Sequence, residues 1–417
     1  MVKRRKRKYK LKKKFKLLLF VIFVLGFILI IKPFKNKDNK KSIFSESYEY
    51  QNIIRNNTNE VIDDDVEALI ISFLNTYFRA MKELKEYDMM KYFNNYEEAY
   101  LNQTALKVLI NSRVKQLNDL KLDKVSYDIY YEDISTNADV IKVVLKENSY
   151  LNFNFMKDIT SKIYNVVNTF YIVKEDDGYK IQKFDKEQGY FIMTKDLYSS
   201  DGKTDEEIKD DLDSILKVYN DEFDKMLKEQ NVLYNRYLEY KDKKFKECDN
   251  KYDRNSAKDY ALSHVLESTP VNYGSLGGNC QNYASWVLNA GGIPMDNVGS
   301  YKWKHYDSSI DETSSKKGRT SSWTGVVNFY NYAKNNTGYG LCSEVDVNTY
   351  YGEAGDIIQI GYDNEYRHSA VVIDTYKKDG STIDLILNSN TGDLEQFPLS
   401  AYVYPLKRLI KVLGFNN

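Results

Sequence analysis

The sequence predicts an α+β protein built from more than one domain. Three observations support this prediction: apolar residues at helical spacing come first, four strand-like runs follow, and a long charged helical stretch precedes a second mixed region. Because domains usually hold about 100–200 residues, a chain of 417 residues is expected to contain two domains and connecting segments.

The first 41 residues differ from the rest in charge. They contain sixteen Lys and Arg and one acid, Asp38, so the remainder of this formally neutral chain carries a net charge of −15. Residues 17–31 are all apolar or Gly26 and lie between Lys16 and Lys32. A helix of this length spans about 22 Å, less than the roughly 30 Å of a hydrocarbon core, so both lysines would have to reach to the interface.

No small-residue cleavage site follows Ile31, and no nearby cysteine can accept a lipid. An uncleaved transmembrane helix over residues 17–31 is therefore expected, with a cleaved signal peptide as the alternative. The basic residues 1–16 then stay cytoplasmic, which predicts a single-pass protein of the cell membrane with extracytoplasmic C-terminal domains. The basic run is interpreted as a signal for this topology rather than as a nucleic-acid-binding arm.

Residues 32–61 are polar and predict a stalk. Apolar residues at helical spacing after Asp63 predict a first helix with capping acids, and a second helix is expected over Glu97–Leu122. Four predicted strands follow: Val125–Tyr131, Asp139–Leu145, Tyr164–Val173 and Tyr179–Lys183, the last two joined by a turn at Asp176-Asp177-Gly178. By pattern alone, residues 62–200 resemble the NTF2-like fold, and no convergent acids or histidines in them suggest chemistry.

The charged stretch from Thr204 to about Lys246 has apolar residues at helical spacing, so residues 201–250 are expected to form a helical connector. The last region, residues 251–417, opens with a predicted helix over Asp253–Leu266. A Gly-rich segment then leads to Asn279 and Cys280, and Gly291-Gly292-Ile293-Pro294 ends the next predicted helix. Cys280 is therefore expected in the first turn of that helix.

This position suits a nucleophile. An ordinary thiol with a pKa of about 8.5 is mostly protonated at neutral pH, whereas the partial positive charge of a helix N-terminus favours the thiolate. Cys280 could instead pack as a small apolar residue, but the Gly-rich loop and the cap before it favour the nucleophile. Cys248 and Cys342 could form a disulfide and leave Cys280 free, which the sequence does not decide. No C-x-x-C spacing is present, and no metal or cofactor is expected.

Three histidines are candidates for the base. His264 lies on the apolar face of a predicted helix, which favours packing, and His305 lies in a polar stretch typical of a surface loop. His368 begins a predicted strand, His368–Asp374, and is therefore the expected base.

A turn over Lys377–Gly380 joins this strand to a second one, Thr382–Asn388. Folding the hairpin about the turn places His368 beside Asn388 or Ser389, so Asn388 is expected to orient the imidazole. A register shift of one residue would substitute Ser389 or Asn390. Asp374 and Asp384 are expected to lie too far along the strands.

Several motifs now point to a family. They are Tyr252-Asp253-Arg254-Asn255, Asn279-Cys280-Gln281-Asn282-Tyr283-Ala284-Ser285, Gly291-Gly292-Ile293-Pro294-Met295, Trp303, Ser322-Trp323, Gly355-Asp356 and His368-Ser369-Ala370. In their order and spacing they resemble the bacterial "putative amidase domain" family, which is related to NlpC/P60 and CHAP proteins.

The resemblance implies a papain-like fold with Cys280, His368 and a polar residue near Asn388 as the catalytic residues. It also implies an oxyanion role for Tyr273. Asn279 replaces the Asp usual before the cysteine: Asn still caps a helix, but an electrostatic role of that Asp is lost. Asp356 is expected to hold a turn rather than to titrate, and Trp303 and Trp323 are expected in the core or the cleft wall.

The expected function is hydrolysis of amide bonds by a cysteine amidase or peptidase, with cell-wall peptidoglycan as the substrate suggested by location and family. The alternative is a catalytically inactive papain-like binding or scaffold module of a cell-envelope complex, and acyl transfer by the same thiol is a third option. Expected partners are a cell-wall peptide or amide, the membrane through the N-terminal helix, and envelope proteins through the middle domain. Nucleic acid is not expected.

Overall fold

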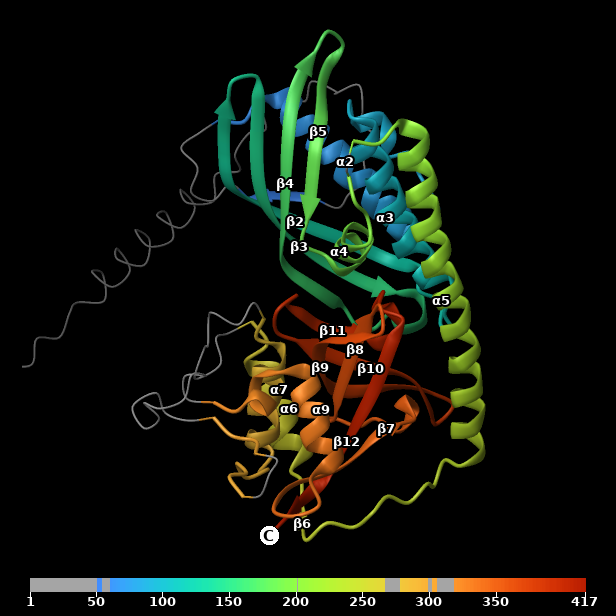
Figure 1. Ribbon diagram of the computed structural model, residues 1–417, viewed down its shortest axis with the longest axis vertical. Helices are drawn as coiled ribbons and strands as arrows, with labels where there is room; N and C mark the ends of the chain where they lie inside the picture. The colour runs from blue at the N-terminus through green and yellow to red at the C-terminus, as the bar shows by residue number, and fades with distance from the viewer. Residues whose placement is uncertain (1–50, 55–60, 201, 267–277, 299–301, 306–318) are drawn as a thin grey trace, which may run out of the picture. The chain divides into compact units, whose positions relative to one another are not determined.

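The computed structural model describes residues 51–54, 61–200, 202–266, 278–298, 302–305 and 319–417 (Figure 1). Helices and strands alternate in blocks through this range, which confirms the α+β class. Short 3₁₀ helices within these ranges are η1 (Met90–Tyr92), η2 (Asn154–Met156), η3 (Thr349–Tyr351) and η4 (Leu399–Ala401).

The transmembrane part of the predicted fold is corrected. Within the described ranges no helix combines the length and apolar character needed to cross a membrane. Residues 1–16 and 17–31 lie outside these ranges, and the apolar run itself would span only about 22 Å as a helix. The predicted transmembrane helix and single-pass membrane location are therefore withdrawn.

The middle part begins with two helices, α2 (Asp64–Glu83) and α3 (Tyr96–Val114). Asp63 caps α2 as predicted, because its carboxylate accepts a hydrogen bond from the Asp65 N–H at 2.9 Å. α3 ends eight residues earlier than predicted. The turn that follows is held by the Asp119 carboxylate, which accepts a hydrogen bond from the Lys121 N–H at 3.2 Å and so competes with helix formation.

Four antiparallel strands follow in sequence order: β2 (Leu122–Asn137), β3 (Val140–Phe153), β4 (Ser161–Glu175) and β5 (Gly178–Lys186). β1 (Gln51–Ile54), which falls in the predicted stalk, pairs in parallel with β2. The helices α2 and α3 pack against one side of this meander (Figure 1). The predicted turn at Asp176-Asp177-Gly178 is confirmed, with Gly178 at φ 128°.

The predicted connector is a long helix, α5 (Asp205–Glu239), preceded by the short α4 (Gly189–Asp196). Thr204 and Glu207 form a reciprocal capping box at the start of α5. α5 packs along α3 (Figure 1), and its last turns reach the C-terminal part. There the Tyr237 hydroxyl accepts a hydrogen bond from the Thr382 N–H at 3.1 Å.

In the C-terminal part, the described residues form four α-helices and an antiparallel sheet. The helices are α6 (Arg254–Ser263), α7 (Cys280–Ala290), α8 (Ser321–Thr324) and α9 (Val326–Asn335). The strands are β6 (Asn250–Lys251), β7 (Gly340–Val347), β8 (Ile357–Tyr362), β9 (Glu365–Lys378), β10 (Ser381–Ser389), β11 (Leu394–Pro398) and β12 (Leu406–Asn416). Their order is β11-β10-β9-β8-β12-β6, and β7 pairs with β12. α6, α7 and α9 pack on β9, the strand that carries His368.

One sheet joins the two parts. β4 pairs antiparallel with β11 through Ile163 opposite Leu394 and Lys162 opposite Glu395, and the last two residues form an ion pair at 3.0 Å. Both parts belong to one compact unit of the chain. The sequence did not predict this junction.

A disulfide between Cys248 and Cys342 ties the segment before β6 to β7 and leaves Cys280 as the free cysteine. The structure thus shows the pairing that the sequence did not decide.

Candidate active site

Cys280 is the first residue of α7, as predicted, and its side chain is 7% exposed. Ala284, Val287 and Leu288, one turn and two turns further on, are fully buried and fix the helix against the sheet. The sulfur is thus held at a helix N-terminus, where unpaired backbone N–H groups favour a negative charge.

Asn279 occupies the N-cap position, but its side chain makes no capping hydrogen bond. Its Nδ2 donates to Asn390 Oδ1 at 2.9 Å, and its Oδ1 accepts from Asn282 Nδ2 at 2.8 Å. Its backbone N–H donates to Thr391 Oγ1 at 2.6 Å. Asn279 therefore connects the start of α7 to the loop after β10.

His368 on β9 lies beside Cys280, close enough for its imidazole to lower the pKa of the thiol. Burial raises the pKa of the Cys280 thiol, but the positive charge of His368 and hydrogen bonds from His368 and from the backbone of Ser369 and Gln281 outweigh it. The net result is a thiol pKa below its ordinary value. The structure thus brings together the two residues predicted as nucleophile and base.

The residues that follow Cys280 and His368 also contact each other, which the sequence analysis missed. Ser369 Oγ donates to Gln281 Oε1 at 2.7 Å, and both side chains are buried. Gln359 on β8 donates to Ser369 Oγ at 3.4 Å and accepts from Arg408 Nε at 2.9 Å. This buried chain of hydrogen bonds holds α7 at a fixed position on the sheet. The sequence held one signal for this contact: a polar residue, Gln281 or Ser369, directly follows each of the two candidate catalytic residues.

The structure does not bring Asn388 to His368, which corrects the predicted third residue. Asn388 pairs with Val371, further along β9, because the hairpin turns at Asp379-Gly380 and Ser381 pairs with Lys378, while the two register shifts in between cancel. Its side chain donates to the Ala261 carbonyl at 3.3 Å and accepts from the Gln396 N–H at 2.8 Å. Asn388 therefore holds α6 and β11 rather than the imidazole.

Tyr273, the predicted oxyanion residue, lies outside the described residues. Another tyrosine, Tyr404, lies near the sulfur: burial and the negative charge of Cys280 raise its pKa to about 12. A Cβ on Gly189, at the start of α4, would lie 2.5 Å from the Tyr404 hydroxyl. Only glycine therefore lets the middle part pack this closely on Tyr404.

The other two histidines have neighbours of their own. His264 stacks on Tyr260 at 4.0 Å between ring centres and is half-buried at the end of α6 rather than in the core. His305 lies 4.5 Å from the Trp286 ring, so it packs on an aromatic surface instead of forming part of a purely polar loop. Trp303 and Trp323 are fully buried in the core, and the Trp323 Nε1–H donates to Asn282 Oδ1 at 2.8 Å.

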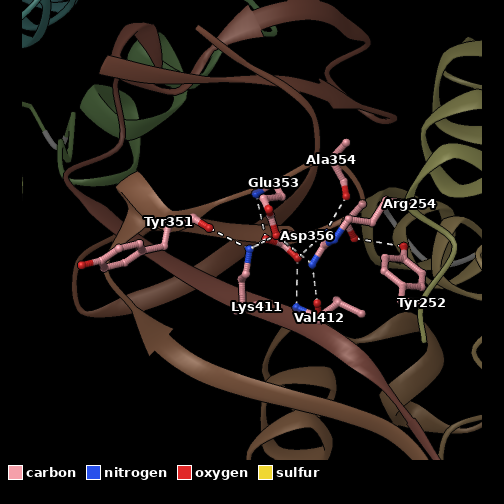
Figure 2. Close-up of polar contacts among 9 residues, drawn as sticks. Tyr252, Arg254, Tyr351, Glu353, Ala354, Asp356, Lys411 and Val412 are labelled. Carbon is pink, nitrogen blue, oxygen red and sulfur yellow. Dashed lines mark hydrogen bonds and ion pairs between the residues drawn. The ribbon is translucent and has the colours of Figure 1, made fainter. Parts of the chain in front are cut away.

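A buried cluster of charges surrounds Asp356 at the start of β8 (Figure 2). The carboxylate accepts from the N–H groups of Glu353 at 2.9 Å and Val412 at 3.0 Å, and it pairs with Arg254 at 2.9 Å and Lys411 at 3.2 Å. Both oxygens are thus occupied, in agreement with the predicted structural role. The motif residue Arg254 also joins α6 to β12 through the Val412 carbonyl.

No group of three or more His, Cys, Asp or Glu side chains suited to a metal ion occurs among the residues that the structure describes.

One comparison with known proteins concerns the C-terminal part. Residues 251–412 match the family described as "Putative amidase domain". This match confirms the family resemblance drawn from the motifs and supports a hydrolase acting on amides. No curated protein matches the chain in sequence.

Two solved structures show weak similarity. The intermembrane space region of the chloroplast protein ARC6 is 10% identical, with a TM-score of 0.22, and the match covers 30% of this chain and 98% of that chain. A variant of Rv3472, a protein of unknown function from Mycobacterium tuberculosis, is 9% identical, with a TM-score of 0.21 and coverage of 38% and 90%. At these TM-scores no conclusion about the present chain is drawn.

Proposed function

We propose that the C-terminal part hydrolyses amide bonds with Cys280 as nucleophile and His368 as general base and acid. One observation carries the proposal: the buried Cys280 thiol at the N-terminus of α7 lies beside the His368 imidazole of β9, an arrangement that favours the thiolate. A thiol held only for packing gains nothing from a hydrogen-bonded histidine.

The chemistry follows from this pair. The Cys280 thiolate attacks the carbonyl carbon, and the C–N bond breaks as the His368 imidazolium donates its proton to the leaving amine. His368 then takes a proton from water, the hydroxide attacks the thioester, and the carboxylic acid leaves as the thiolate re-forms. The backbone N–H of Cys280, at the first helical position, is the proposed donor to the oxyanion.

The proposed substrate is a peptide or amide bond of cell-wall peptidoglycan. The resemblance to NlpC/P60 and CHAP proteins supports this choice. The same thioester could instead be resolved by an amine, so transfer of the acyl group is the competing outcome. An added amine that appears in the product would distinguish the two reactions.

The test uses the full chain with isolated peptidoglycan and mass spectrometry of the released fragments. Wild-type protein is expected to produce fragments with new amino and carboxyl ends, whereas Cys280→Ser protein should produce none. Ser343→Ala, which changes a buried serine that bonds the Ala333 carbonyl, serves as the matched control. Equal fragment release by wild-type and Cys280→Ser protein would reject the proposal.

A further inference from the structure

A cavity of about 340 Å³ lies between the middle part and the C-terminal part, and His368 is one of its lining residues. The middle part contributes α3 and β3 through Arg113, Glu147 and Ser149, and much of the remaining wall is apolar, including Phe78 and Phe397. A volume of this size lies in the range of small-ligand sites, about 300–1,000 Å³. The candidate base thus faces a space that the middle domain helps to enclose.

Three buried side chains that the middle part contributes to this cavity carry polar atoms without a hydrogen-bond partner among the described residues: Arg113 (Nε and Nη1), Glu147 (Oε1) and Ser149 (Oγ), each at most 3% exposed. The C-terminal part contributes two more such atoms, Ser389 Oγ and the Tyr402 hydroxyl. Buried polar atoms in folded proteins are nearly always paired, because an unpaired one costs stability. Five such side chains around one cavity indicate groups arranged for a ligand.

The charges on this wall favour an anion. Glu147 is already matched, since its Oε2 pairs with Lys186 at 2.6 Å. Arg113 makes no ion pair within the described part of the chain, and although burial lowers its pKa to about 10, it remains protonated at neutral pH. Its guanidinium packs 5.5 Å from the Phe153 ring centre.

Two further acids line the cavity. Glu187 is exposed to solvent. Asp393 is half-buried, and its carboxylate accepts hydrogen bonds from the Thr391 N–H at 3.1 Å and from Asn165 Nδ2 at 3.0 Å. Neither acid pairs with Arg113, so the buried wall keeps one unmatched positive charge.

We propose that this cavity holds the carboxylate end of the substrate: Arg113 binds a free carboxylate, and Glu147 Oε1 and Ser149 Oγ bind the neighbouring amide group. The substrate class is then a short peptide, or another small amide, with a free carboxylate. The scissile amide lies toward His368. This inference rests on the proposed amidase function. It means that the middle part contributes residues to the substrate site. A planar guanidinium suits a carboxylate because two N–H groups can donate in parallel.

The test measures binding without turnover. Cys280→Ala protein is dialysed against a mixed tripeptide pool with free C-terminal carboxylates and against the same pool amidated at the C-terminus, and retained peptides are quantified by mass spectrometry. We expect at least tenfold greater retention of the carboxylate pool. Arg113→Met in the same background should abolish this preference, whereas Arg236→Gln, which removes an exposed arginine on α5, should keep it.

Two results would overturn the inference: equal retention of both pools by Cys280→Ala protein, or an unchanged preference after Arg113→Met. The thermal midpoint of Arg113→Met should not fall, because an arginine without a partner in an apolar site is not a stabilising group. If Arg113→Met does not fold, the retention of the two pools by Cys280→Ala protein still shows whether the site prefers a free carboxylate. Because no bond is cleaved in this assay, its failure leaves the proposed hydrolysis untouched.

Discussion

At the scale of single residues, the hydrogen bond from Ser369 to Gln281 positions the candidate nucleophile relative to the base. Ser369→Ala removes this bond and leaves Gln281 Oε1 without its donor, which should cost about 1–3 kcal/mol of stability. We also expect the pH midpoint of Cys280 alkylation to rise, because the Ser369 backbone contact that lowers the thiol pKa is loosened.

Ser343→Ala is the matched control for Ser369→Ala, since it removes a buried serine bond of 3.0 Å elsewhere. It should lower stability to a similar degree and leave the alkylation midpoint unchanged. A shift of the midpoint in both variants, or in neither, would remove Ser369 from the positioning network.

Glu98 predicts a pH dependence of stability. Burial raises its pKa to about 7, against about 4.3 for an unfolded glutamate. The folded state therefore holds the Glu98 proton more tightly than the unfolded state does. The stability that this gives the folded protein is fully present below about pH 4.3 and is lost as the pH rises through 7. Glu98→Gln should stabilise the protein by roughly 1–3 kcal/mol more at pH 8 than at pH 4.5. Urea unfolding at both pH values measures this, and an equal effect at both would refute it.

The sequence was sufficient to predict that Cys280 begins a helix and that His368 lies on a strand, because an N-cap residue, a Gly-rich loop and an apolar strand pattern are local signals. It was not sufficient for the third residue. The hairpin turns at Asp379-Gly380, so Ser381 pairs with Lys378 and Asn388 pairs with Val371, three residues from His368. The two register shifts within the hairpin cancel at Asn388, so the difference comes from the exact position of the turn, which the run Lys377–Gly380 does not determine.

At the scale of elements, the disulfide between Cys248 and Cys342 closes a loop with a sequence separation of 94. Replacing both residues by serine should cost about 2–5 kcal/mol, chiefly because the unfolded chain regains freedom. Urea unfolding without reductant measures the loss. Cys280→Ser, which leaves the disulfide intact, should shift the unfolding midpoint much less. A larger shift for Cys280→Ser than for the double variant would contradict the assignment of the disulfide to Cys248 and Cys342.

Helices were predicted more accurately than strands. α2 and α5 carry side-chain caps at Asp63 and Thr204 that fix their starts in the sequence itself. β2 and β3 extend well past the predicted ranges, because their solvent-side positions are polar and interrupt the apolar pattern while the backbone pairing continues. The junction of β4 with β11 was not predictable, since it joins residues more than two hundred positions apart.

At the scale of the whole molecule, the shared sheet and the docking of α5 couple the two α+β parts. All three tryptophans, Trp286, Trp303 and Trp323, lie in the C-terminal part, so their fluorescence reports its unfolding alone. Far-ultraviolet circular dichroism reports the helices and strands of both parts. We expect the two urea transitions to coincide. Two separated transitions would show that the parts unfold independently.

The proposed mechanism requires that His368 lie beside Cys280 and favour its thiolate, and alkylation by iodoacetamide tests this most directly. Cys248 and Cys342 are protected as a disulfide, so mass spectrometry of the native protein follows Cys280 alone. Because only the thiolate reacts, the rate should rise with pH through a midpoint below the ordinary value of about 8.5, and His368→Gln should move that midpoint upward. Midpoints that are equal in the two proteins, at or above 8.5, would contradict the account.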